Sequence, residues 1–181
     1  MTATLDPEEA YEWYLKQIDL LESMGRTGAP TQDERCAKFF GMPFDEFAET
    51  LRDLRDELEQ SAYLTIIASG EAVLQVDFRA RKGRKASVPL RNEARALAKK
   101  EKKKGRRIVL EDVLDAWKEF PHAPSGVISE FKQLLPHRHW LAHGRYFEDA
   151  APVPDDPGFA IARFRNLRIS LGRIDSEFPR R

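Results

Sequence analysis

The chain has almost no cysteine, because Cys36 is the only one in 181 residues. A single thiol can neither form an internal disulfide nor supply a thiolate cluster for a metal, which excludes disulfide-stapled secreted folds. No apolar run approaches the roughly 20 residues that a membrane span needs, and Met1 to Met24 is too acidic and polar for a signal peptide. We therefore expect a cytoplasmic protein without a membrane segment.

Two other patterns are missing. No stretch alternates apolar and polar residues with the period of a strand, and no glycine-rich loop of the kind that cradles nucleotide phosphates is present. The apolar side chains instead recur at spacings of three and four, which is typical of amphipathic helices. The sequence therefore predicts an all-α helical bundle, with an N-terminal helical extension at residues 1–42 and the main helical domain at residues 43–181.

Caps, prolines and apolar spacing predict where the helices begin and end. Asp6 and Pro7 form a cap followed by a proline, so a first helix should run from there to about Met24. Thr31 is a candidate cap for a short helix that ends at Gly41, and Ser125 for the helix that leads to Arg138. Further helices are expected over residues 44–76, as one helix or as two with a break near residue 60, and over 88–104, 110–117 and 159–174.

Loops are expected at two places, and a helix break at a third. Residues 79–87 are basic and lack an apolar face, and residues 149–158 contain three prolines. Pro136 lies inside the apolar pattern that follows Ser125. Because proline lacks a backbone donor, it should kink or restart the helix just before Arg138.

The net charge is zero, but the charges are separated along the chain. Residues 1–60 carry 15 acidic and 6 basic side chains, whereas residues 79–107 carry 14 basic and 2 acidic ones. One part of the surface can therefore attract a polyanion while another part repels it. The ordinary alternative is that both blocks are solvated surfaces that keep the protein in solution.

The segment that carries the most chemistry is RHWLAHGRYF, which begins at Arg138 and includes His139 and His143. An arginine guanidinium matches the geometry of phosphate oxygens, and a histidine has a pKa near 6.5 and can exchange a proton at neutral pH. On an ideal helix Arg138 and His143 lie about 7.5 Å apart along the axis and about 140° apart around it. The length of arginine and the break at Pro136 can bring the two groups together.

This spacing resembles the Arg-x4-6-His motif of the HEPN superfamily, and the string is similar to the motif region of bacterial HEPN-type proteins. The resemblance covers about residues 44–173. It implies a helical bundle that forms a homodimer, with an endoribonuclease site that needs neither metal nor cofactor in a groove between two motif helices. Members of the family commonly act as prokaryotic toxins or in defence against phage, and an antitoxin or other regulatory partner often silences them.

The resemblance also implies roles for residues. Arg138 would hold the scissile phosphate, His143 would be the principal acid–base residue, and His139 would assist. Glu71, from an earlier helix, and Arg145 would support the site. Apart from the resemblance, the charge of the basic segment predicts that it contacts RNA phosphates without reading sequence, through Arg79, Arg81, Lys82, Arg84, Lys102, Lys103, Lys104, Arg106 and Arg107.

Other interpretations of the same residues stay open. Arg138 can simply pair with an acid on a neighbouring helix, and Glu71 and Asp77 are the only acids in the apolar stretch of residues 61–78. His139 and His143 are four residues apart, as metal ligands often are, but a third ligand is missing. The functional alternative is a catalytically silent HEPN module that dimerises and binds a protein or a nucleotide.

Overall fold

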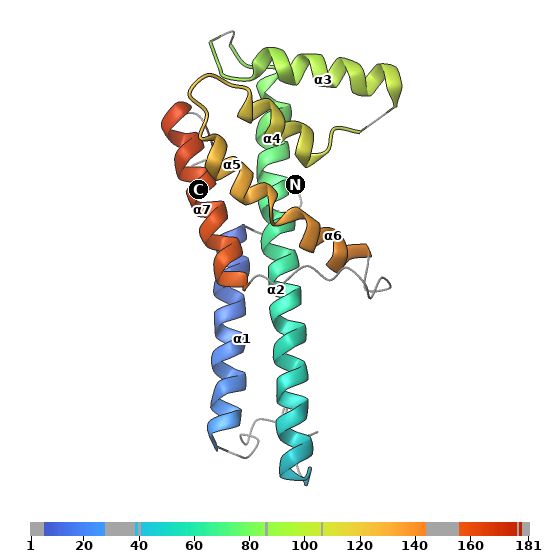
Figure 1. The fold of residues 1–181 in the computed structure, drawn as a ribbon, viewed down its shortest axis with the longest axis vertical. Coiled ribbons are helices and arrows are strands. Elements are labelled where there is room, and N and C mark those ends of the chain that lie inside the picture. The colour runs from blue at the N-terminus through green and yellow to red at the C-terminus, as the bar shows by residue number, and fades with distance from the viewer. Residues whose placement is uncertain are drawn as a thin grey trace.

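The computed structural model describes residues 6–27, 39, 41–85, 87–105, 107–143, 156–176 and 178. These residues contain helices and no strand, which confirms the predicted all-α class. No helix within the described ranges is long and apolar enough to cross a bilayer. The helices are α1 (Pro7–Thr27), α2 (Phe44–Arg81), α3 (Arg91–Lys104), α4 (Leu110–Lys118), α5 (Ser125–Lys132), α6 (Leu135–His143) and α7 (Pro157–Ile174) (Figure 1).

Helix α2 is the central element, and its 38 residues extend over about 57 Å. Its apolar spacing continues through Gln60 and Ser61, so the expected segment is one uninterrupted helix rather than two. Helix α1 runs beside its first half, and α4, α5, α6 and α7 gather around its second half (Figure 1). The acidic first half of α2 and the basic α3 consequently lie at opposite ends of the molecule.

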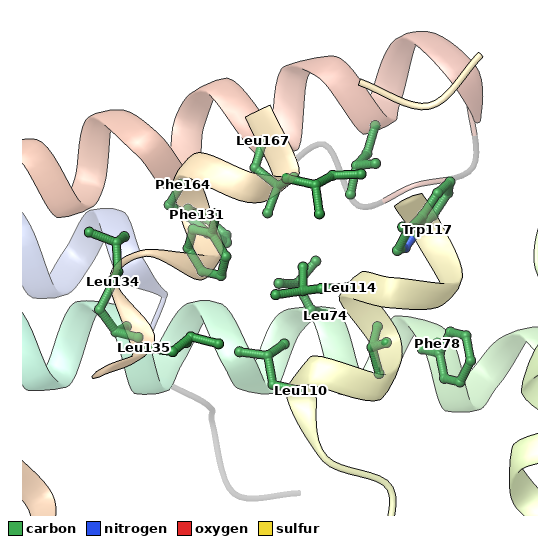
Figure 2. Close-up of a cluster of buried hydrophobic side chains, with 14 of the residues drawn as sticks. Leu74, Phe78, Leu110, Leu114, Trp117, Phe131, Leu134, Leu135, Phe164 and Leu167 are labelled. Carbon is green, nitrogen blue, oxygen red and sulfur yellow. The ribbon is translucent and has the colours of Figure 1, made fainter. Parts of the chain in front are cut away.

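The main core lies where α4, α5 and α7 meet the second half of α2. Its largest members include Trp117, Phe131 and Phe164, which are essentially inaccessible to solvent (Figure 2). Burying an aromatic or aliphatic side chain of this size stabilises the fold by about 1.5–3 kcal/mol. This cluster therefore holds the second half of α2 in place, and the candidate site is built on that half.

Gly70 allows α7 to approach α2 closely. A Cβ atom at this position would lie 2.9 Å from Cδ2 of Phe164 and 3.7 Å from Cζ of Phe131. Both rings are buried, so neither can move aside without disturbing its neighbours.

We expect Gly70→Ala to lower the free energy of unfolding by about 1–3 kcal/mol, because overpacking outweighs the better helix propensity of alanine. Urea denaturation measures this change. Gly172→Ala is the matched control, since a Cβ there meets nothing within 4 Å and should leave stability unchanged or raised. Equal effects of the two substitutions would contradict the close approach of α7 at Gly70.

Helix α1 is attached to the rest of the fold at its beginning. Ala10 belongs to the main core, and the Glu8 carboxylate accepts hydrogen bonds from the Arg165 guanidinium on α7, including one of 3.0 Å from Nε. This pairing raises the pKa of Arg165. The remainder of α1 packs on α2 through two smaller clusters, around Tyr14 and around Met24. Burial raises the pKa of the Tyr14 phenol to about 12, as expected for a hydroxyl in such a seam.

The prediction of an exposed loop over residues 79–87 is wrong for residues 79–81, which belong to α2. Helix α2 continues to Arg81, whose side chain is fully buried. Its guanidinium donates to Asp77 Oδ2 and Asp175 Oδ2, both at 2.6 Å, and to the Pro89 carbonyl at 2.9 Å. It also lies 4.7 Å from the ring centroid of Trp117. Arg81 is therefore the centre of a buried ionic cluster and not a surface cation.

Smaller differences concern the helix ends. Ser125 is the first residue of α5 rather than its cap, and α3 begins at Arg91 after Leu90, which has a φ of 57°. Helix α7 begins earlier than expected, at Pro157, where the Asp156 carboxylate accepts a 2.7 Å hydrogen bond from the Gly158 amide. Residues 31–38 and 40 of the short helix expected from Thr31 to Gly41, and residues 149–155 of the loop expected over 149–158, lie outside the described residues.

Candidate functional site

The predicted break at Pro136 is confirmed, and it positions Arg138. Helix α5 ends at Lys132 and α6 begins at Leu135. The Tyr63 hydroxyl on α2 donates a 3.0 Å hydrogen bond to the Leu134 carbonyl at this junction. The ring of His137, which is buried, stacks on the Tyr63 ring with the centroids 4.5 Å apart. These two contacts fix the first turn of α6 against α2, immediately before Arg138.

Arg138 pairs with Glu71 across the interface between α6 and α2. Arg138 Nη2 lies 3.0 Å from Glu71 Oε2, and Gln75 Nε2 donates a 3.0 Å hydrogen bond to Glu71 Oε1. The side chains of Arg138 and Glu71 are 22% and 24% exposed, so the pair is shielded but still reachable from solvent. The alternative that Arg138 pairs with this acid is thus confirmed.

The pair lines a pocket of about 370 Å³. The pocket is bounded by residues from α2, from the segment before α4, and from α6: Ala68, Glu71, Ala72, Gln75, Arg107, Ile108, Val109 and Arg138. Arg107 was expected among the RNA contacts and Arg138 as the phosphate-binding residue. The fold brings these two cations from distant parts of the sequence to the same pocket, beside a carboxylate and an amide.

Two donors of α6 are buried and have no acceptor among the described residues. They are Nε of Arg138, a pocket residue, and Nε1 of Trp140. A buried N–H group without a partner is uncommon in folded proteins and costs stability.

The histidines of α6 have different surroundings. His139 is exposed, with Nε2 3.3 Å from Glu111 Oε1, and it does not line the pocket. The side chain of His143 and all of Arg145 lie outside the described part of the chain. The structure therefore places Arg138 beside Glu71, places His139 elsewhere, and leaves the role expected for His143 untested.

The basic segment is divided between several environments. Lys82, Lys102 and Lys103 are exposed, near α3 at the end of the molecule beyond α6 (Figure 1). Arg79 lies 3.7 Å from Glu101, and Arg84 lies 3.7 Å from Asp77. The expectation that Arg81 contacts RNA is wrong, because its side chain is buried and ion-paired. Arg106 and the side chain of Lys104 lie outside the described residues.

Sequence reasoning missed three contributors to the site: Gln75, Tyr63 and His137. Gln75 follows Glu71 by one helical turn, a spacing that places both on the same face of α2. Tyr63 and His137 had no such local signal, because they meet only when α6 packs on α2. Neither models of known protein families, nor curated proteins, nor solved structures give a match to this chain.

Proposed function

We propose that the protein is a HEPN-type endoribonuclease that cuts RNA without a metal ion, at the pocket that contains Arg138. The observation that carries the proposal is the shared lining of this pocket by Arg138 and Arg107. Two guanidinium groups at one opening can hold consecutive phosphates of a strand. The exposed lysines of α3 extend the positive surface beyond the pocket and would add contacts that do not depend on sequence.

The chemistry follows from the RNA itself. The 2′-oxygen attacks the neighbouring phosphorus, a P–O bond to that oxygen forms, and the bond to the 5′-oxygen breaks. A base takes the proton of the 2′-hydroxyl, an acid gives a proton to the leaving 5′-oxygen, and a cation stabilises the charge on the phosphate. In this proposal Arg138 is the cation and His143 exchanges the protons. The assisting role expected for His139 has no place in this scheme, because its side chain lies outside the pocket, beside Glu111.

Glu71 has a positioning role in this scheme. Its carboxylate holds the Arg138 guanidinium from one side through Nη2. Nε of Arg138 is buried and has no acceptor among the described residues, so the phosphate would bind to the exposed part of the guanidinium. Two-point binding of phosphate requires this guanidinium to keep a fixed orientation.

The biology that the resemblance implies belongs to the same proposal. The enzyme would act as a homodimer in the cytoplasm of a prokaryote, as a toxin or a phage-defence component with an antitoxin or another regulatory protein as partner. The silent HEPN module remains the second candidate, because Glu71 already compensates the charge of Arg138. Such a module would bind a nucleotide or a protein without cutting RNA.

Cleavage in the presence of a chelator tests the proposal. We expect the purified protein to cut single-stranded RNA equally well with and without excess EDTA, because no step uses a metal ion. Gel electrophoresis of labelled RNA measures the rate. Loss of activity in EDTA that a divalent cation restores would contradict the mechanism, and absence of cleavage under all conditions would favour the silent module.

A further inference from the structure

The pocket at Arg138 is larger than a phosphate group needs. Its volume of about 370 Å³ falls in the range of sites that bind small molecules. Four aliphatic side chains, Ala68, Ala72, Ile108 and Val109, form its apolar wall. A flat ring could lie against such a wall, whereas a phosphate gains nothing from it. The space therefore suits the nucleobase attached to a bound phosphate.

Helix α2 contributes two hydrogen-bond acceptors to the pocket, the Glu71 carboxylate and the Gln75 amide oxygen. A carboxylate offers about four lone-pair positions. Glu71 uses one on each oxygen, for Gln75 Nε2 and for Arg138 Nη2. Each oxygen thus keeps capacity for one further donor, and Glu71 lines the pocket. Gln75 adds an amide oxygen that donates nothing and can only accept.

The four bases differ in what they offer to such a carboxylate. Guanine has two adjacent donors on its Watson–Crick edge, the N1–H and the N2 amino group, which match two carboxylate oxygens. Adenine and cytosine each offer one amino group there. Uracil offers a single N3–H between two carbonyl oxygens, and these would face the carboxylate and be repelled. Bases of single-stranded RNA are commonly recognised on this edge.

From these features we infer that the pocket is a base-recognition site that prefers amino-bearing bases, guanine above all, with Glu71 as the specificity-determining residue. The inference rests on the proposed function, since it names the base next to the phosphate that Arg138 would hold. Arg107 lines the same pocket. In this inference its planar guanidinium would cover the base or bind the next phosphate.

Binding of mononucleotides tests this inference on the unmodified protein. Isothermal titration with GMP, IMP, AMP, CMP and UMP should give the tightest binding for GMP and the weakest for UMP. IMP differs from GMP only in lacking the N2 amino group. Its dissociation constant should therefore be at least about tenfold higher than that of GMP, because a hydrogen bond to a charged acceptor contributes about that much to affinity. Equal affinities for GMP and UMP would overturn the inference.

A pair of matched variants locates the site. Ala72→Leu fills the pocket and should abolish GMP binding, whereas Ala80→Leu, at an exposed position on the same helix, should leave it unchanged. Undiminished GMP binding by folded Ala72→Leu would place the nucleotide elsewhere.

RNA cleavage without base preference would overturn this inference but would leave the proposed nuclease activity intact. Selective GMP binding without any cleavage would overturn the nuclease and leave the base site standing.

Discussion

Arg138→Ala and His143→Ala should each lower the rate of RNA cleavage at saturating substrate by about a hundredfold to ten-thousandfold. Loss of a positioned cation and loss of a proton-transfer group both have effects of this size. Because the two groups act in the same step, the double variant should be little worse than either single one. Single-turnover kinetics on a labelled RNA measures all three rates.

Two exposed residues provide controls of the same chemical type. Arg52→Ala, on the first half of α2, and His122→Asn, between α4 and α5, should keep the parental rate. Asparagine is used at His122 because the φ there is 63°, which asparagine tolerates. If folded His143→Ala cuts RNA as fast as the parent, His143 has no catalytic role, and this result would support the silent-module alternative.

Arg81→Met should lower the free energy of unfolding by about 3–5 kcal/mol. The substitution keeps an apolar side chain beside Trp117 but leaves Asp77 and Asp175 buried without their shared cation, and uncompensated buried charges have this cost. Urea denaturation followed by circular dichroism measures the loss. Arg79→Met, two residues earlier in an exposed ion pair, is the control and should change stability by less than about 1 kcal/mol.

The pH dependence of this loss has a defined sign. Burial raises the pKa of the Asp77 carboxyl, while Arg81 and Arg84 oppose the rise and Asp175 adds to it. Since the folded-state pKa is above the unfolded one, Asp77 favours folding at acid pH, and this contribution is lost as the pH rises through the folded-state pKa. Without Arg81 the pKa should rise further. The stability difference between Arg81→Met and the parent should therefore shrink as the pH is lowered from neutral into the acid range. A difference that grows toward acid pH would contradict the ionic cluster.

Local sequence patterns were sufficient for most of the helices. The spacing of three and four residues predicted α2, α4 and α7, and the missing donor of Pro136 predicted the restart of α6. The pairing of Glu71 with Arg138 was among the alternatives left open for a carboxylate on an apolar helix. These features depend on the helical period and on residue chemistry, which a sequence displays directly.

Long-range packing decided the rest. Arg81 is buried because Asp175, 94 residues later, meets it when α7 packs on α2. The basic residues around Arg81 led to the prediction of an exposed loop at this position. Arg107 lies at the Arg138 pocket because the segment before α4 is held against α2 by the buried Ile108 and Leu110. Local residue spacing cannot predict such a long-range contact. The sequence therefore predicted that both arginines bind RNA, but not that they line the same pocket.

The central claim is that Arg138 holds a phosphate of the RNA while the adjacent ribose 2′-hydroxyl attacks that phosphate. The chemical groups at the ends of the cleaved RNA test this claim most directly. Once the cut site in an oligonucleotide is mapped, mass spectrometry of the products in EDTA should find a 2′,3′-cyclic phosphate, or its hydrolysis product, and a 5′-hydroxyl. A single 2′-deoxy substitution at that site should stop cleavage there, and Arg138→Ala should remove the cyclic product. Products with a 3′-hydroxyl and a 5′-phosphate, or cleavage that continues at the deoxy position, would contradict the account.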